Sequence, residues 1–438
     1  MVKKIYVDKK LDADHCLGTF MSESDYDVLL EEDVDVYGPS LDGSCTEDNI
    51  VCKFRKNVFS EEEMLNAYEG LRPAAVQSQN RGIAAGPRGE RLDADGRGGR
   101  DWVTPYQLEV LDWLQRPDAL IDDVSLDDIK HKYESKKAGI DETRGVVWLR
   151  SKVIAERGAY DNWFEPWLNE VIPLSRDEQR KVAAYVAKKY ISETNYAQSV
   201  MSGVAGYYGR YPRIPWGRAC SYNEKHPDEF ARSFPYLRKL DQKFKEMLPQ
   251  RWGVQRKAAD SIDPRFVIDD TVFTTLTVNH NWRTAAHLDA GDLGPGFSNI
   301  SGLSKDGGWS GGHLVVPEYR AAIAIQPRDL LLVANHTAIH GNTELFPAEG
   351  QEKPDRLTVV AYFREDLFKL KSWDYEALRR KFVQERSHNK EHPLYRPLWN
   401  GVSPNMWAES EWEEYLKAHS MEDEDGVVGG HVDLESFF

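Results

Sequence analysis

Residues 265–282 read RFVIDDTVFTTLTVNHNW, a run rich in Thr, Val and Phe that is typical of a β-strand. Further short apolar runs follow, separated by Gly, Pro or charged turns: GGHLVVP (311–317), RAAIAIQP (320–327), DLLLVAN (329–335) and RLTVVAYF (356–363). Several short strands at this spacing predict two sheets packed face to face as a jelly roll. We therefore expect a β core that begins near residue 264.

Helical patterns flank this core on both sides. Residues 60–71, SEEEMLNAYEGL, begin with Ser60 and have Glu63 three positions on, which is the capping-box pattern of a helix start. Further helices are expected over 175–192, 227–248, 372–387 and 406–419. The predicted fold class is α+β, with a jelly-roll core and flanking helices both N- and C-terminal to it.

Composition divides the chain into five expected parts. These are an acidic N-terminal segment (1–48), a helical N-terminal region (49–199) with a Gly/Arg-rich loop (81–100), the β core (200–368), a helical C-terminal cap (369–420) and an acidic tail (421–438). The Gly/Arg-rich loop has almost no apolar content, so it is either a surface linker or a loop that contacts phosphates.

Net charge alone argues against a nucleic-acid partner, because it is −16. The acidity is uneven, however. Residues 1–48 carry 13 acidic and 4 basic residues, and residues 409–438 carry 10 and 1. The chain between them is close to neutral, so local basic patches that bind nucleic acid remain possible there.

The apolar runs and the cysteines indicate the cellular compartment of the protein. No apolar run approaches the 18 residues of a membrane span, and the first 16 residues have no apolar signal-peptide region. The four cysteines are too scattered for a disulfide framework or a zinc cluster. We expect a reducing, intracellular setting: the cytoplasm (host cytoplasm for a viral protein) or the nucleus of a eukaryote.

A metal-binding pattern lies within the β core. AAHLDAGD (285–292) holds His287 and Asp289 at the end of a strand, where side chains two residues apart share a face. LLLVANHTAIHGNT (330–343) brings His340 just past another strand. Two histidines and one carboxylate form the facial triad of non-haem iron(II) oxygenases, which leaves iron positions open for a 2-oxo acid and O2.

Arg356 begins the next strand, 16 residues after His340. A buried guanidinium there suits the distal carboxylate of 2-oxoglutarate, because its planar fork binds carboxylate with two hydrogen bonds. His336 competes with His340 for the third ligand position. The spacing to Arg356 and the Gly-Asn-Thr turn favour His340, whereas His280 and His313 are expected to be structural or pocket-lining.

These motifs resemble the oxygenase domain of the TET/JBP family, which oxidises the 5-methyl group of pyrimidines in nucleic acid. The resemblance is carried by TVNHNWRTAAHLDAGD (277–292), GGHLVVPEYRAAIAIQPRDLLLVANHTAIHGNT (311–343) and RLTVVAYFRE (356–365). It covers about residues 200–368, and JBP-like and phage-type members look most similar. It implies a double-stranded β-helix with helices packed around it.

The resemblance also implies roles for residues. His287, Asp289 and His340 would bind Fe(II), and Arg356, helped by Thr358 on the same strand face, would bind 2-oxoglutarate. O2 would be the other co-substrate, with ascorbate as reductant or, as in an algal relative, co-substrate. Asp292, five residues after the first histidine, would contact the target base; alternatively, Asp292 is only a turn residue.

The implied function is oxidation of 5-methylcytosine in DNA to 5-hydroxymethylcytosine. Asp292 favours cytosine, because a carboxylate accepts a hydrogen bond from its amino group. A thymine hydroxylase that makes 5-hydroxymethyluracil is the first alternative, and an inactive DNA-binding module of the same fold is the second. A prolyl or small-molecule hydroxylase is also compatible, since fold does not fix substrate. We expect DNA as the partner, no membrane and no obligate protein partner.

Overall fold

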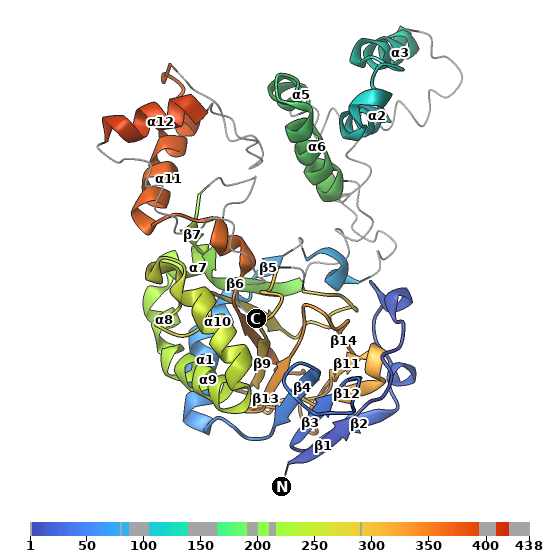
Figure 1. The fold of residues 1–438 in the computed structure, drawn as a ribbon, viewed down its shortest axis with the longest axis vertical. Coiled ribbons are helices and arrows are strands. Elements are labelled where there is room, and N and C mark those ends of the chain that lie inside the picture. The colour runs from blue at the N-terminus through green and yellow to red at the C-terminus, as the bar shows by residue number, and fades with distance from the viewer. Residues whose placement is uncertain are drawn as a thin grey trace.

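The computed structural model is a mixed α/β fold built on one large and one smaller sheet, with helices around them (Figure 1). It describes residues 2–78, 81–86, 105–138, 164–190, 200–209, 216–289, 291–393 and 409–419. The Gly/Arg-rich loop lies outside these residues from position 87 onward.

The large sheet has ten strands. In spatial order they are β1 (Lys3–Tyr6), β3 (Val34–Tyr37), β4 (Ile50–Arg55), β13 (Leu330–Val333), β9 (Ser298–Leu303), β16 (Leu357–Tyr362), β8 (Thr275–His280), β6 (Val200–Tyr208) and β5 (Gln77–Ser78), with β7 (Arg218–Ala219) beside β6. All neighbours are antiparallel except β1 and β3. β16 is the central strand of the part that carries the site.

The smaller sheet has four strands, in the order β14 (Gly341–Asn342), β11 (Leu314–Val316), β12 (Ala321–Ile323) and β2 (Val28–Leu30). β10 (Trp309–Gly311) and β15 (Leu345–Pro347) form a separate pair. The expected strands over 311–317, 320–327, 329–335 and 356–363 are thus present, although they divide between different sheets.

The period-2 pattern of each strand decides what its two faces touch. In β13, Leu330 and Leu332 belong to one hydrophobic cluster, whereas Leu331 and Val333 belong to another. The first cluster packs the large sheet against helices, and the second packs it against the smaller sheet. A strand buried on both faces reads as a continuous apolar run, as DLLLVAN does.

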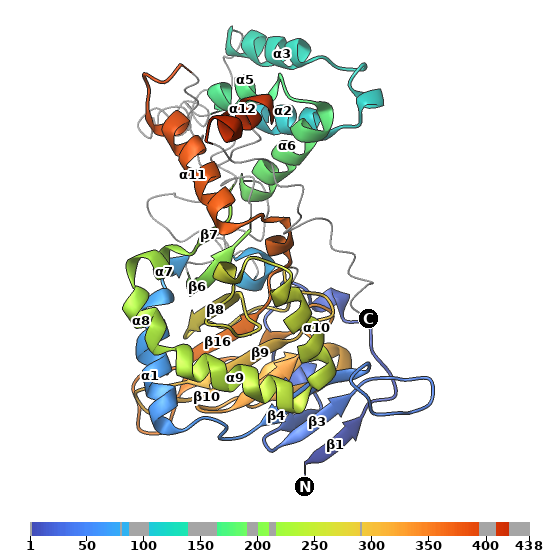
Figure 2. The same ribbon diagram turned by 60° about the vertical axis from the view of Figure 1, so that its left-hand side comes forward.

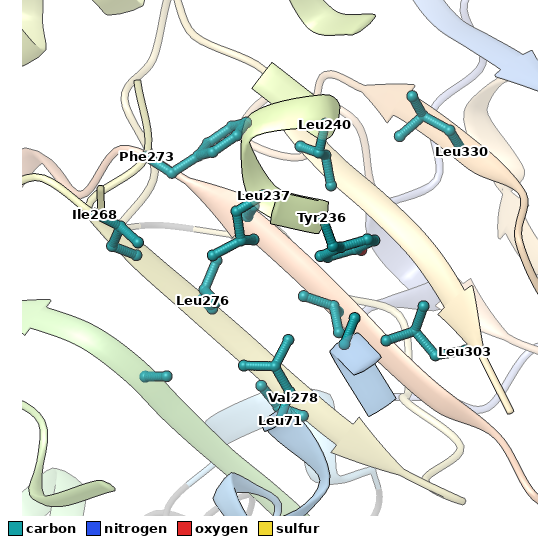
Figure 3. Close-up of a cluster of buried hydrophobic side chains, with 14 of the residues drawn as sticks. Leu71, Tyr236, Leu237, Leu240, Ile268, Phe273, Leu276, Val278, Leu303 and Leu330 are labelled. Carbon is teal, nitrogen blue, oxygen red and sulfur yellow. The ribbon is translucent and has the colours of Figure 1, made fainter. Parts of the chain in front are cut away.

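Helices cover the outer face of the large sheet. They are α1 (Glu61–Leu71), α7 (Ser221–Lys225), α8 (Pro227–Arg232), α9 (Phe234–Met247) and α10 (Pro249–Asp260). Figure 3 shows Leu237 of α9 close to Leu276 of β8, within the hydrophobic cluster that also contains Leu240 and Val278. The expected capping box is confirmed: the Glu63 amide donates to Ser60 Oγ (3.1 Å), and the Ser60 amide donates to Glu63 (2.7 Å).

The N-terminal segments contribute to both sheets. β1 and β3 extend the edge of the large sheet beyond β4, and β2 pairs in parallel with β12 of the smaller sheet. The expectation of an acidic segment followed by a helical region with a Gly/Arg-rich loop therefore misses these strands. Alternation in VDVY and IVCKFR is weak because these strands are mostly buried. The domain boundaries proposed from composition remain a prediction.

Helices also stand apart from the sheets (Figures 1 and 2). α2 (Pro105–Gln115), α3 (Leu126–Ala138), α5 (Phe164–Val171) and α6 (Arg176–Tyr190) share a hydrophobic core of their own. The chain leaves the large sheet at β5 and returns at its neighbour β6, so these helices are an insertion between paired strands. α11 (Trp373–His388) and α12 (Glu409–Ala418) pack together around Trp412. None of the described helices is both long and apolar enough to cross a membrane.

A buried polar network fixes the start of β16. The carboxylate of Asp355 accepts from Tyr68 Oη (2.6 Å), Ser304 Oγ (2.9 Å) and the amides of Lys305 and Asp306 (2.6 and 2.8 Å). His280 Nε2 lies 3.5 Å away. Although burial opposes ionisation, the hydrogen bonds with His280, Tyr68 and these amides hold the pKa of Asp355 well below its usual value. The network links α1, the loop after β9 and the strand that carries Arg356.

We predict that Asp355→Asn lowers the free energy of unfolding by about 2–4 kcal/mol at pH 7, because several buried donors lose an ionised acceptor. A carboxyl group whose pKa is depressed by folding stabilises the protein above its unfolded pKa, about 3.9. The difference between wild type and variant should therefore be full above about pH 4 and shrink as the pH falls below it.

Urea unfolding at pH 7 and at pH 3 measures both differences. Asp270→Asn is the matched control, since the Asp270 side chain is fully exposed, and it should change stability by less than about 0.5 kcal/mol. An Asp355→Asn protein as stable as this control at pH 7 would contradict the role of the network.

Candidate metal centre and its pocket

The centre is built on a backbone pairing between two distant segments. The His287 amide donates to the His340 carbonyl (2.9 Å), and the His340 amide donates to the His287 carbonyl (3.0 Å). Paired residues of an antiparallel bridge project their side chains to the same side. The two imidazole rings accordingly lie with their centroids 4.4 Å apart.

Asp289 completes a group of three metal-ligating side chains. One of its carboxylate oxygens is 3.4 Å from His287 Nε2, and the other is 3.7 Å from His340 Nε2. One ligand atom from each residue lies within 4.8 Å of the others. Among the described residues this is the only group of His, Cys, Asp or Glu side chains with that geometry. It matches the donor set of a facial triad for iron(II).

Hydrogen bonds orient each ligand. His287 Nδ1 is 2.8 Å from the Ala285 carbonyl, and His340 Nδ1 is 3.0 Å from the Ala338 carbonyl. When each Nδ1 carries the ring proton and donates it to the carbonyl, each Nε2 presents its lone pair to a metal. The Asn335 amide group donates to Asp289 (3.0 Å), which holds the carboxylate in place.

The protonation states of His340 and Asp289 also suit metal binding. Burial and the neighbouring His287 lower the pKa of His340 to about 4, so this ring is neutral at physiological pH. Burial would raise the pKa of Asp289, but the hydrogen bond from His287 and the two nearby imidazoles outweigh it and lower the value to about 2. Neutral imidazole and ionised carboxylate are the forms that bind a metal.

Arg356 is a buried cation with unused hydrogen-bonding groups. Its side chain is 3% exposed, and its Nε and Nη1 have no hydrogen-bond partner. No described carboxylate forms an ion pair with it, and its guanidinium carbon lies 5.9 Å from the centre of the Trp309 ring. Burial lowers the pKa of Arg356 to about 10, so it stays charged near neutral pH. An unpaired buried cation is unfavourable, and a carboxylate ligand would satisfy it.

One cavity of about 460 Å³ joins these groups. It is lined by every site residue that the sequence suggested: His287, Asp289, Asp292, His340, Arg356 and Thr358. Alternation along β16 explains part of the lining, because Leu357, Val359 and Ala361 pack against the helices while the intervening side chains face the cavity. Asp292 is 7% exposed and accepts a hydrogen bond from Ser298 Oγ (2.6 Å).

Histidines other than the triad have different surroundings. His336 is absent from the lining of this cavity and borders a small void beside Phe297 instead. His280 belongs to the Asp355 network, and His313 Nδ1 is buried without a hydrogen-bond partner. The structure therefore brings His340, and not His336, to the metal group.

Sequence reasoning missed part of the cavity wall. Tyr362 and Arg364 follow Arg356 at even spacing, so alternation would have identified them. Arg81 and residues 82–84 also line the cavity, although they come from far earlier in the chain. Nothing in the local sequence of this segment indicates that position.

The N-terminal segments also hold the segment that carries His287. The amides of Ala285 and Ala286 donate to the carbonyls of Ala84 (2.9 Å) and Thr19 (2.8 Å), and the Gly18 amide donates to the Ala286 carbonyl (2.8 Å). At His287 the same segment pairs with His340. The backbone around His287 is thus fixed from both sides.

Comparison with known proteins gives matches over the same part of the chain. Residues 207–365 match the Tet_JBP family, described as the oxygenase domain of the 2OGFeDO superfamily. The thymine dioxygenase JBP1 of Leishmania braziliensis is 32% identical over 207 residues, which are 47% of this chain and 24% of that protein. The thymine dioxygenase JBP1 of Trypanosoma brucei brucei is 36% identical over 170 residues, 38% of this chain and 19% of that protein.

The chain thus spans about a quarter or less of the length of these relatives. Among solved structures, NgTET1 in complex with 5mC DNA overlaps 85% of this chain and 86% of that chain, with a TM-score of 0.38 and 8% sequence identity. At that score the two share too little geometry for residue roles to be transferred.

We predict that His340→Ala abolishes tight binding of Fe(II) or Mn(II), because one of three protein ligands is lost. His336→Ala is the matched control and should retain the metal. Metal content after dialysis, measured by inductively coupled plasma mass spectrometry, separates the two variants. The opposite pattern, with metal lost only in His336→Ala, would overturn the assignment of the third ligand.

We also predict that Arg356→Met weakens 2-oxoglutarate binding by about 100-fold or more, because a buried charge pair is lost. Thr358→Val should weaken it less, since it removes only a neighbouring hydroxyl. Calorimetric titration of the Mn(II)-loaded protein measures both affinities. Thermal stability of Arg356→Met should be unchanged or higher, because an unpaired buried cation is replaced by an apolar chain. Unchanged affinity would remove Arg356 from the co-substrate site.

Proposed function

Since residues 207–365 belong to the Tet_JBP oxygenase domain of the 2OGFeDO superfamily, we propose that this protein is an iron(II)- and 2-oxoglutarate-dependent dioxygenase that hydroxylates the 5-methyl group of a pyrimidine base in DNA. The observation that carries the proposal is a single cavity that combines the His287–Asp289–His340 group with the unpaired guanidinium of Arg356.

The residues present fit the cofactors of such an enzyme. Iron held by the triad, with 2-oxoglutarate and O2, would supply the oxidant that converts a methyl group to a hydroxymethyl group. His287, Asp289 and His340 would hold the metal, and Arg356 would accept the distal carboxylate of 2-oxoglutarate with Thr358 beside it. Ascorbate would serve as a reductant. An inactive DNA-binding module would not require the buried, unpaired guanidinium of Arg356, which is unfavourable for folding.

The arrangement of strands supports a double-stranded β-helix for the core. In the large sheet, β13, β9, β16 and β8 are successive neighbours, and β14, β11 and β12 form the facing sheet. After β9 the chain crosses to β11 and β12 of the smaller sheet, returns to the large sheet at β13, crosses again to β14 and returns at β16. The site lies between the sheets, where side chains from both converge.

DNA bases reach such a cavity only after leaving the helical stack. A methyl group inside a duplex cannot approach a metal that is enclosed by two sheets, so we expect the target nucleotide to flip into the cavity. Its volume of about 460 Å³ lies within the range of ordinary small-molecule sites.

We favour thymine over 5-methylcytosine as the target base. The relatives reported above are named thymine dioxygenases. The argument for cytosine assumed an ionised Asp292. Burial and the nearby Asp289 raise the pKa of Asp292 well above its usual value, and a protonated carboxyl group can donate as well as accept. Asp292 therefore gives no preference for cytosine by its charge.

Mass spectrometry of nucleosides tests the proposal. Duplex DNA with thymine as its only 5-methyl base, and duplex DNA with 5-methylcytosine as its only one, are each incubated with the protein, Fe(II), 2-oxoglutarate and O2. We expect 5-hydroxymethyluracil from the first duplex, and none from an Asp289→Ala variant. 5-Hydroxymethylcytosine as the main product would reverse the base preference. No oxidised base from either duplex would contradict the proposal.

A further inference from the structure

One peptide group orients the third metal ligand. The Ala338 carbonyl lies 3.0 Å from His340 Nδ1. The amide of the same peptide group, carried by Ile339, donates to Glu318 Oε2 (2.8 Å). Because a peptide group is planar and rigid, it couples the carboxylate at one end to the imidazole at the other. Glu318 is 6% exposed and lies outside the cavity lining, so it reaches the third ligand through the backbone.

The register of the smaller sheet explains why a carboxylate stands at this position. β11 and β14 pair with Val315 opposite Gly341. The same register, continued by two residues, would set Pro317 opposite Ile339. The chain turns at Pro317 instead, and the carbonyl of this residue accepts a hydrogen bond within the turn. No described backbone carbonyl accepts from the Ile339 amide, so the Glu318 side chain takes the place of a missing strand neighbour.

Lys10 holds the carboxylate from the other side. Its Nζ lies 3.0 Å from Glu318 Oε1 and donates to the Thr337 carbonyl (3.1 Å). The Leu11 amide donates to the Glu318 carbonyl (2.9 Å). Lys10 and Glu318 thus fix the backbone on both sides of Ala338. They come from the N-terminal segment and from the turn between β11 and β12, far from His340 in sequence.

The peptide group that orients His287 has a neutral partner instead. His287 Nδ1 is 2.8 Å from the Ala285 carbonyl. The amide of that peptide group, carried by Ala286, donates to the Thr19 carbonyl (2.8 Å). Hydrogen bonds to an ionised acceptor are roughly twice as strong as those between neutral groups. The peptide group beside His340 is therefore held and polarised more strongly than the one beside His287.

Polarisation of this peptide group affects the imidazole. Hydrogen bonds in a chain strengthen one another, so a carboxylate at the amide end makes the carbonyl at the other end a better acceptor. A better acceptor at Nδ1 fixes the proton on that nitrogen, orients the ring and raises the basicity of Nε2. The consequence for His340 is a stronger bond from Nε2 to a metal ion.

We propose that Glu318 is a positioning residue of the metal centre, which acts on His340 through the peptide group that begins at Ala338. The inference rests on the metal group of the proposed function and does not depend on the target base. Glu318 fixes the rotation of the peptide group, so that the Ala338 carbonyl faces the imidazole. Its charge strengthens the hydrogen bond that this carbonyl accepts, and Lys10 keeps the carboxylate in place.

Metal titrations of wild type and two variants test the proposal without turnover. Glu318→Gln keeps an oxygen acceptor for the Ile339 amide but removes the charge, whereas Glu318→Leu removes both. We expect affinity for Co(II), measured by titration calorimetry, to fall about 10-fold in Glu318→Gln and about 100-fold in Glu318→Leu. The visible absorption bands of bound Co(II) depend on the donor strength of its ligands, so they should shift in both variants.

Asp329→Asn is the matched control. The Asp329 carboxylate is also buried and pairs with a lysine, Lys56 (2.7 Å). It also accepts from backbone amides, those of Asn57 (3.0 Å) and Gln326 (2.9 Å), but it lies outside the cavity lining. Thermal unfolding should show a loss of stability in this variant as in Glu318→Gln. Its affinity for Co(II) should stay within about 2-fold of wild type, because distant sites act independently.

The comparison with this control decides between a positioning and a merely structural role. If both Glu318 variants lose stability but keep the wild-type affinity and absorption bands of Co(II), as Asp329→Asn does, the inference is overturned. Glu318→Gln alone decides the matter if Glu318→Leu does not fold.

Failure of this inference can be told from failure of the proposed function. A protein that oxidises thymine in DNA, but whose Glu318→Gln variant binds Co(II) as wild type does, retains the function and loses the positioning residue. A protein whose Glu318→Gln variant binds Co(II) more weakly, but which oxidises neither thymine nor 5-methylcytosine, retains the positioning residue and loses the function.

Discussion

The backbone pairing of His287 with His340 is the constraint on which the site depends. These two hydrogen bonds join one segment that follows β8 and another that lies between β13 and β14, and they set both imidazoles on one side of the chain. Asp289 can meet both rings only because this pairing brings them together. Carbonyls of Ala285 and Ala338 then orient the rings, and Asn335 orients the carboxylate. The main-chain pairing thus brings the three candidate metal ligands together.

Strand β16 makes the cavity polar while the surrounding fold stays apolar. One face of the strand, from Leu357 to Ala361, is buried against helices, and the other lines the cavity. An unpaired guanidinium at Arg356 opposes folding, since its charge is removed from water. The Asp355 network stabilises the adjoining backbone, because one carboxylate satisfies donors from α1 and from the loop after β9. The stabilising carboxylate of Asp355 and the destabilising guanidinium of Arg356 are thus neighbours in sequence, at the start of β16.

Residues that precede the β core in sequence contribute directly to the site. Gly18 and Thr19 pair with Ala286, Ala84 pairs with Ala285, and Arg81 reaches the cavity. These contacts satisfy backbone groups of the segment just before His287, which would otherwise lack partners. The helical insertion leaves and re-enters the sheet beside this wall, between β5 and β6.

The sequence by itself predicted most strands of the core and the side chains of the candidate metal group. Short apolar runs predicted the strands, and the H-x-D pair followed by His340 and Arg356 predicted residues that do line one cavity, because these signals are local. The H-x-D pair itself lies after β8 and outside the named strands, and not at a strand end as expected. The strands β3 and β4 escaped prediction because they are mostly buried and lack a clear alternation, and β1 and β2 because they are only four and three residues long. Only the tertiary structure decided that His340 and not His336 joins Asp289, and that Arg81 lies in the same cavity, since those positions depend on how distant segments pair and not on what surrounds each residue in the chain.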